Sequence, residues 1–168
     1  MNFKATKDTL VISITLGVIC LFAFIGYQSL ICIIDDNGNT STLILHSCII
    51  FSLLMILLVS YLFAPNKYSI NDSSLIISRP VGKKIIDLNS IKEVELIEKS
   101  DIKNLTRTFG VGGLFGIYGK FYSKKFGDII IYGTQNRNYV GIKTQNKKIL
   151  ITPNNLDIVK HLKKKACL

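Results

Sequence analysis

Two long apolar runs near the start of the chain limit what it can fold into. Residues 9–34 contain no charged side chain, and residues 37–66 contain none either. An α-helix needs about 17 to 25 mostly apolar residues to cross the hydrocarbon core of a bilayer, so both runs are long enough. As buried helices of a soluble protein they would be apolar on all sides, and the rest of the chain is too short to cover them. The sequence therefore predicts two membrane spans, at about residues 9–31 and 42–64.

The charges around these runs predict how the spans are oriented. The polar turn at residues 35–41 holds two aspartates and no base, whereas Lys4 and Lys7 precede the first run and several lysines follow the second. Basic residues accumulate on the cytoplasmic side of membrane proteins. We therefore expect a multi-pass protein of the cell (inner) membrane with both termini in the cytoplasm. A cleaved signal peptide is disfavoured, because the first run exceeds a secretory hydrophobic segment and has no small-x-small site after it.

The polar and thiol groups of the runs do not form a recognisable site. The cysteines at positions 20, 32, 48 and 167 lack metal-binding spacing. Whether Cys32 and Cys48 pair as a disulfide is left open, since both are expected near the outer surface. His46 lies near the outer end of the second span with no carboxylate in either span to pair with it, so an interfacial hydrogen bond explains it better than a proton or ion site.

Strand-like patterns begin after the second run. Apolar residues alternate from residue 67 onward, and Asn, Asp, Ser, Gly and Pro mark turns between the alternating segments. Seven short strands are predicted, at residues 68–70, 75–77, 83–88, 91–96, 128–132, 139–143 and 148–151. The first four should form an antiparallel meander. An amphipathic helix then follows, capped by Asn154 or Asn155 and burying Leu156, Val159 and Leu162.

Residues 99–127 break this pattern with glycines and aromatic side chains. The run 110–115 is not a dinucleotide fingerprint, because Phe115 stands where the third glycine belongs. One interpretation is a long loop whose aromatic rings cover an open end of a barrel. The other is that four of the rings contact the lipid interface or a partner, namely Phe109, Phe115, Tyr118 and Phe121.

Three segments of this half resemble the bacterial pleckstrin homology (PH) domain families found in membrane-attached proteins. The segments are residues 107–122 (RTFGVGGLFGIYGKFY), 127–133 and 151–153. The resemblance covers about residues 67–165. Eukaryotic PH domains that bind inositol phosphates need Lys and Arg around the first hairpin turn, where this chain has Asn71, Asp72 and Ser73. Phosphoinositide specificity is therefore not implied.

The resemblance and the apolar runs together imply a membrane-anchored α+β protein. Its transmembrane helical hairpin would be residues 1–65, and its cytoplasmic PH-like domain would be residues 66–168. The PH fold implies a seven-stranded antiparallel β-barrel that is closed at one end by a C-terminal helix.

The positive charge is concentrated in the second half of the chain. Up to residue 65 there are 2 basic and 3 acidic residues, and from residue 66 there are 19 basic and 8 acidic residues, a net charge of +11. Lysines that face an anionic leaflet are one explanation, at about 1 kcal/mol for each lysine close to it. Lysine as the chain's default surface residue is the other. Only 3 of the 19 basic residues are arginine and no recognition motif occurs, so nucleic acid is not an expected partner.

No set of side chains indicates catalysis. His46 and His161 lack Cys, Asp or Glu at ligand spacing, and the glutamates at 93, 95 and 98 are expected on the solvated face of a strand. We therefore expect no enzyme activity, no cofactor and no metal. The expected function is a non-catalytic module that docks a protein partner or an anionic lipid at the cytoplasmic membrane surface, through Lys83, Lys84 and the four aromatic residues. The alternative is an accessory subunit of a membrane complex, with Gly17, Ala23 and Gly26 at the interface.

Overall fold

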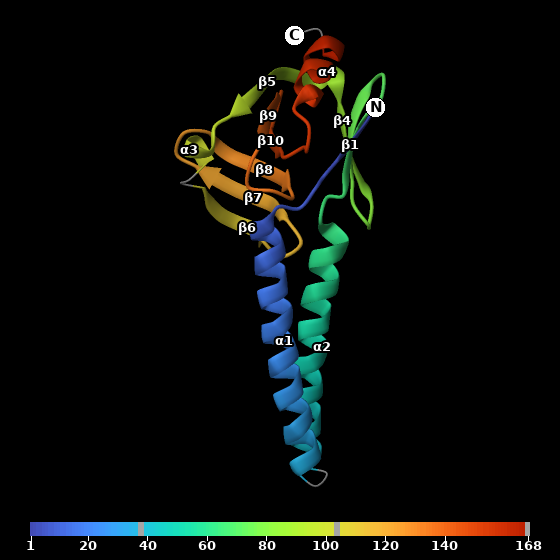
Figure 1. Cartoon of the computed structure of the whole chain (residues 1–168), viewed down its shortest axis with the longest axis vertical. Helices are drawn as coiled ribbons and strands as arrows, with labels where there is room; N and C mark the ends of the chain where they lie inside the picture. Colours follow the sequence, from blue (N-terminus) through green and yellow to red (C-terminus); the bar gives the residue numbers. More distant parts are fainter. Residues whose placement is uncertain (37–38, 103–104, 167–168) are drawn as a thin grey trace.

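Two long helices project from a domain of two sheets in the computed structural model, which describes residues 1–36, 39–102 and 105–166 (Figure 1). Helix α1 (Thr9–Asp35) and helix α2 (Thr40–Phe63) run antiparallel, and both described ends of the chain lie at the domain. Only 6% and 0% of their most apolar segments are buried. By length and composition both helices could cross a membrane, and their exposure is opposite to that of core helices in a soluble protein.

The two helices begin where side chains can cap them. The Asp8 carboxylate accepts a hydrogen bond from the Val11 amide at 3.0 Å, and the Asn39 side chain accepts one from the Ser41 amide at 3.1 Å. Such caps satisfy amides that have no partner within the helix. The helices lie at the positions expected for spans, and α1 continues to Asp35, beyond the predicted end at residue 31.

Within the described residues, ten strands form two separate sheets. The first sheet has the order β1-β2-β3-β4 and contains β1 (Asn2–Lys4), β2 (Lys67–Ile70), β3 (Ser74–Ser78) and β4 (Lys83–Asp87). The second has the order β5-β9-β10-β8-β7-β6 and contains β5 (Ile91–Ile97), β6 (Thr106–Gly112), β7 (Ile117–Ser123), β8 (Gly127–Gly133), β9 (Tyr139–Thr144) and β10 (Lys148–Ile151). Short helices occur at η1 (Leu88–Ser90), α3 (Lys99–Ile102) and α4 (Asp157–Lys165).

This arrangement corrects the expected seven-stranded closed barrel. The first sheet has four strands, the second has six, and the two do not close into one barrel. The predicted meander stops at β4, because β5 pairs with β9 in the other sheet. Strand β10 pairs in parallel with β8 and antiparallel with β9, so the sheet is not purely antiparallel.

Three of the ten strands were not predicted. Strand β1 precedes α1 and pairs with β2, which follows α2. The paired residues Lys4 and Lys67 are 63 positions apart in the chain. Strands β6 and β7 form a hairpin within the segment that was interpreted as a long loop, so the loop interpretation is wrong. Glycines interrupt the apolar alternation there and hide its strand period.

The core lies between the two sheets and beneath α4. Side chains of the first sheet, such as Tyr68 and Leu75, pack with Val140 and Ile142 of the second sheet and with Leu162 of α4. The buried residues of α4 are Ile158 and Leu162, whereas Leu156 is 37% exposed, which corrects the predicted face of this helix. A second cluster lies on the same six-stranded sheet and contains Ile97, Phe121, Ile129, Ile131, Tyr139 and Leu150.

Candidate membrane-interface site

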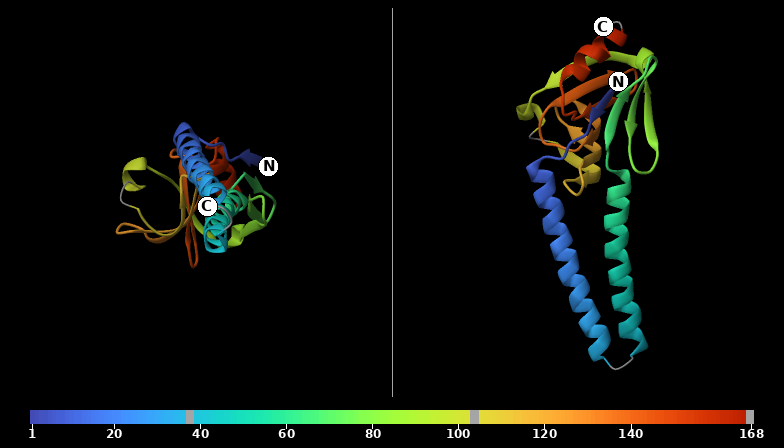
Figure 2. Two further views of the ribbon diagram at one scale, coloured as in Figure 1. Left: turned by 90° about the horizontal axis from the view of Figure 1, so that it is seen from below. Right: turned by 45° about the vertical axis from the view of Figure 1, so that its right-hand side comes forward.

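The turn between β6 and β7 lies between the domain ends of α1 and α2, which are farther apart there than at the turn that connects them (Figure 2). The Phe115 amide donates a hydrogen bond to Thr15 Oγ1 at 3.0 Å. The Phe115 ring meets the Tyr61 ring edge-on, with 5.6 Å between centroids, and the Lys7 ammonium lies 5.1 Å from the Phe115 centroid. One turn of the hairpin thus contacts both long helices.

Two further contacts hold the end of α2. The Tyr118 hydroxyl donates a hydrogen bond to the Ser60 carbonyl, and the Val81 amide donates one to the Leu62 carbonyl at 3.1 Å. Carbonyls in the last turn of a helix have no partner within the helix, so both bonds complete the end of α2. Burial raises the pKa of the Tyr118 hydroxyl to about 12, so it remains a neutral donor above the pH at which an exposed tyrosine ionises.

The start of α1 is fixed to the domain in the same way. The Asp8 carboxylate that caps α1 also accepts a hydrogen bond from the Asn136 amide at 2.6 Å. The Thr134 hydroxyl donates to the Thr6 carbonyl at 2.8 Å. Because both helices are bonded to the domain where they enter it, the orientation of the sheets relative to the helices is set by the fold.

The predicted lysines lie beside the end of α2. Lys83 and Lys84 begin β4, directly after the turn at residues 79–82, and this turn lies next to the domain end of α2 (Figure 2). Lys83 is exposed and Lys84 is half-buried. A surface contact at these residues remains a prediction.

The four predicted aromatic residues lie in different environments. Phe109 on β6 is 76% exposed, and Phe115 is half-buried between the helices. Tyr118 is 8% exposed and bonded to α2, and Phe121 is 7% exposed in the second core cluster. Tyr118 and Phe121 are therefore covered by the chain itself, on opposite faces of β7, where Tyr118 meets α2 and Phe121 packs in the second core cluster. A lipid or partner contact by these four residues remains a prediction.

Sequence reasoning missed a groove beside the end of α2. It has a volume of about 510 Å³. Its lining comes from α2, from the β3–β4 turn and from strands β6, β7 and β8, and includes Val59, Phe63, Arg79, Phe109, Val111, Lys120 and Tyr132. These segments are distant in the sequence, so no local pattern indicates the groove. The one available signal is Arg79, one of only three arginines in the chain.

Arg79 is held between aromatic rings in this groove. The centre of its guanidinium group lies 5.5 Å from the Phe63 centroid and 6.0 Å from the Tyr132 centroid. Its Nε atom is buried and has no hydrogen-bond partner. Among the residues that the structure describes, no carboxylate lies within ion-pair distance of Arg79.

The lysines of α4 lie at the other end of the domain, away from α1 and α2 (Figure 1). They are Lys160, Lys163, Lys164 and Lys165. Lys165 forms an ion pair with Asp72 at 2.8 Å. Only part of the positive charge therefore lies on the side of the domain that the long helices enter.

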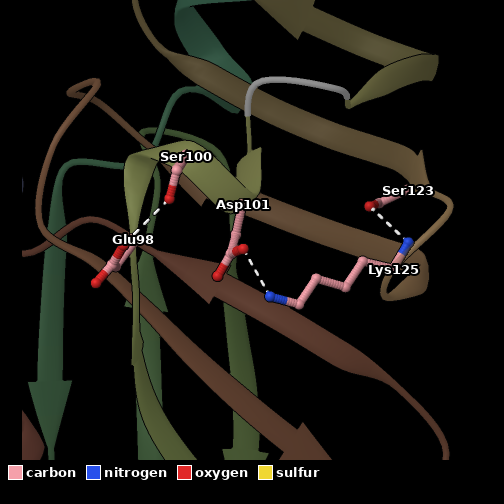
Figure 3. A network of polar contacts seen from close by, with 5 residues as sticks. All are labelled: Glu98, Ser100, Asp101, Ser123 and Lys125. Atoms are coloured by element: carbon pink, nitrogen blue, oxygen red, sulfur yellow. Dashed lines mark hydrogen bonds and ion pairs between the residues drawn. The ribbon is translucent and has the colours of Figure 1, made fainter.

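The polar contacts around α3 are surface interactions (Figure 3). Lys125 pairs with Asp101 at 2.6 Å, and the Ser100 hydroxyl donates to Glu98 at 3.2 Å. Exposed pairs of this kind contribute at most about 1 kcal/mol. Within the described parts of the chain, no three His, Cys, Asp or Glu side chains are grouped so that they could hold a metal ion.

At the far end of the helix pair, His46 lines a hollow together with Cys32, Asp35 and Asp36. The two aspartates lie outside the predicted spans, and the His46 Nδ1 atom is buried with no hydrogen-bond partner among the described residues. The sequence predicts that the turn at residues 35–41 lies on the outer side. Residues 37–38 of this turn lie outside the described residues. Cys32 and Cys48 are free thiols in the structure.

Comparison with known proteins bears on the sheet domain and the helix that follows it. The family model of the bacterial PH domain matches residues 66–166, which is more than half of the chain. The match begins at residue 66, shortly after the end of α2, and it ends at residue 166, the last residue that the structure describes. Two helices that could span a membrane therefore precede it. Comparison with curated proteins and with solved structures gave no match. The resemblance carried by residues 107–122 is thus confirmed, and the chain belongs to the bacterial PH domain family.

Proposed function

We propose that this protein is an integral membrane protein that holds a non-catalytic binding module against the cytoplasmic leaflet of the cell membrane. Its two helices would span the bilayer with both termini in the cytoplasm, and the module would be residues 66–168. There it would dock a protein partner or an anionic lipid. PH domains are generally non-catalytic binding modules, which supports a binding role for this one.

The fixed attachment of the domain to the helices supports this proposal most strongly. Both helices are bonded to the domain at Asp8, Thr15 and Ser60, so one side of the domain would always face the bilayer. That side carries basic and apolar groups, among them the turn at residues 79–82, Lys83 and the exposed Phe109 ring. Lysines close to an anionic leaflet are attracted to it, and apolar rings are stabilised at its interface.

Fluorescence quenching by lipid tests the membrane contact, because the chain contains no tryptophan. A single tryptophan is introduced as Val81→Trp at the tip of the turn, where Val81 is 47% exposed. The matched control is Leu156→Trp at the start of α4, where Leu156 is 37% exposed. In proteoliposomes that contain brominated lipid, we expect strong quenching of the first variant and little of the second. Equal quenching, or none in either, would overturn the proposed contact.

Charge reversal asks whether the contact is electrostatic. Lys83→Glu and Lys84→Glu in the Val81→Trp variant should reduce quenching in bilayers rich in phosphatidylglycerol, because the turn would be repelled. Unchanged quenching would place the contact on other residues.

The topology is tested with single cysteines in a cysteine-free background. A membrane-impermeant maleimide should label Asn39→Cys in intact cells, and Lys164→Cys only after permeabilisation.

A second candidate is an accessory subunit of a membrane complex that binds other spans through its helices. A groove of about 390 Å³ between α1 and α2 favours it, because its apolar lining includes the small residues Ala23 and Gly26. Small residues let helix backbones approach closely in membranes. Crosslinking in native membranes separates the two candidates. Docking predicts crosslinks from residues 67–168, whereas the subunit role predicts crosslinks from residues 9–64.

A further inference from the structure

The groove around Arg79 combines a partly buried cation with an apolar wall at the end of a long apolar helix. The helix α2 has 24 residues, which corresponds to about 36 Å at about 1.5 Å per residue. The hydrocarbon core of a bilayer is about 30 Å thick. If α2 spans the membrane as proposed, its last residue, Phe63, lies at the depth of the lipid headgroups, and Arg79 lies beside Phe63.

The guanidinium group of Arg79 lacks a counter-ion within the described chain. Its Nε atom is buried with no hydrogen-bond partner, and none of the described residues that line the groove is a carboxylate. A half-buried charge with an unpartnered buried donor is stabilised when an ion of opposite sign binds to it. Arginine presents a planar fork of donors that matches the oxygens of a phosphate group. Lys120, an exposed residue of the same lining, adds a second cation.

The remaining lining of the groove is apolar and continuous with the surface of α2. Val59 and Phe63 are 44% and 43% exposed, so the groove opens onto helix surface that would face lipid chains. Phe109, which is 76% exposed, and Val111 of β6 form the opposite wall. An occupant must therefore carry a negative headgroup and a hydrocarbon chain, and lipid molecules of the adjacent leaflet have both.

We infer that the groove binds one anionic phospholipid, with its phosphate on Arg79 and Lys120 and an acyl chain against Phe109, Val59 and Phe63. This inference rests on the proposed placement of the domain at the membrane and adds a defined lipid site to it. The site differs from a general attraction to an anionic surface because it depends on one arginine that is held between Phe63 and Tyr132.

Native mass spectrometry of the full-length protein in detergent tests the site. The probes are phosphatidylglycerol, phosphatidylcholine and glycerol 3-phosphate, each titrated separately. We expect one retained phosphatidylglycerol per chain, weaker retention of phosphatidylcholine, and no retention of glycerol 3-phosphate, which lacks acyl chains. Arg79→Gln should weaken phosphatidylglycerol binding by about tenfold or more, since a charge-assisted contact is lost. Lys164→Gln is the control, because Lys164 carries the same charge, is exposed on α4 at the other end of the domain and does not line the groove.

A second variant keeps the result independent of folding. If Arg79→Gln lowers the unfolding temperature of the lipid-free protein, Lys120→Gln is used instead, because Lys120 is exposed and its loss should still weaken binding. Equal binding of both lipids, an equal loss of binding in Lys164→Gln, or capture of a second copy of the chain in place of lipid would overturn the inference. Normal quenching of Val81→Trp together with unchanged lipid binding by Arg79→Gln and Lys120→Gln would refute the site and leave the proposed function standing.

Discussion

Two glycines face each other across β6 and β7 where the backbones leave no room for a side chain. Gly110 pairs with Gly119, and both have positive φ, at 122° and 129°. A Cβ on Gly119 would lie 2.2 Å from the Phe109 carbonyl oxygen. This hairpin carries Phe109, Phe115 and the Tyr118 hydroxyl to the ends of the long helices. The glycines therefore permit the close pairing on which the candidate site is built.

Gly119→Ala should destabilise the domain by about 1 to 3 kcal/mol or more. Alanine is strained at this φ, and its Cβ would clash with the backbone of Phe109 and Gly110. Thermal unfolding of the full-length protein in detergent measures the loss. Gly17→Ala is the control, since nothing lies within 4 Å of the corresponding Cβ on α1. Similar unfolding temperatures for the two variants would contradict this account of the hairpin.

Three buried tyrosines predict how stability depends on pH. Burial raises the pKa of the hydroxyls of Tyr68, Tyr118 and Tyr139 to about 12, from 10.0 for an exposed tyrosine. The folded protein therefore holds these protons more tightly than the unfolded chain does. The resulting stability should be complete below pH 10 and should be lost as the pH rises through about 12. Tyrosinate absorbance recorded with circular dichroism checks this, and ionisation of all seven tyrosines near pH 10 without unfolding would refute it.

At the scale of elements, the start of α1 does more than begin a helix. Asp8 both caps α1 and accepts the Asn136 amide of the β8–β9 connection. Asn39 caps α2 at the opposite end with one bond to Ser41 and has no comparable link to the domain among the described contacts. A helix cap thus has different roles in the two helices. At Asn39 it only begins α2, whereas at Asp8 it also joins α1 to the second sheet.

Asp8→Ala should therefore cost more stability than Asn39→Ala. Loss of a cap costs about 0.5 to 2 kcal/mol, and a hydrogen bond to a charged group adds about 1.5 to 3 kcal/mol. Hydrogen exchange offers a local readout. The exchange rate of the Asn136 amide should rise in Asp8→Ala and should stay the same in Asn39→Ala. If both variants leave that amide equally protected, the link between α1 and the sheet is not what protects it.

On the scale of the whole molecule, contacts on both helices should hold the domain at one angle to α1 and α2. The β6–β7 turn bonds to Thr15, the Tyr118 hydroxyl bonds to Ser60, and Val81 bonds to Leu62. A domain on a free linker would instead sample many orientations. A fixed orientation is what would keep the Arg79 groove and the 79–82 turn on the proposed membrane side.

Nitroxide distance measurements test this rigidity. Labels are placed on Cys20 of α1 and on Lys164→Cys of α4, with the other cysteines replaced by serine. The distance distribution should be narrow, and it should broaden in the double variant Thr15→Val and Tyr118→Phe, which loses a hydroxyl from each contact. Tyr122→Phe is the control because Tyr122 is 46% exposed. An equally broad distribution in the unmodified protein would show that the domain moves freely.

The sequence by itself determined the features that depend on local composition. The two helices follow from uncharged apolar runs, and seven of the strands follow from alternation, because both signals lie within one short segment. The glycine-rich hairpin was missed because residues such as Gly110 and Gly119 replace the side chains whose period reveals a strand. Leu96 is 56% exposed although it lies on the same face of β5 as the buried Val94, so alternation within the strand does not give the burial of every residue.

Only the tertiary structure decided which strands pair and what lies beside the end of α2. Strand β1 joins β2 across the whole helical hairpin, and β10 lies between β8 and β9, so neither sheet closes into the expected barrel. Arg79, Phe63 and Phe109 come from three separate segments and meet in one groove. Such contacts depend on the balance of burial and hydrogen bonding over the whole chain, and no single segment of the sequence contains that information.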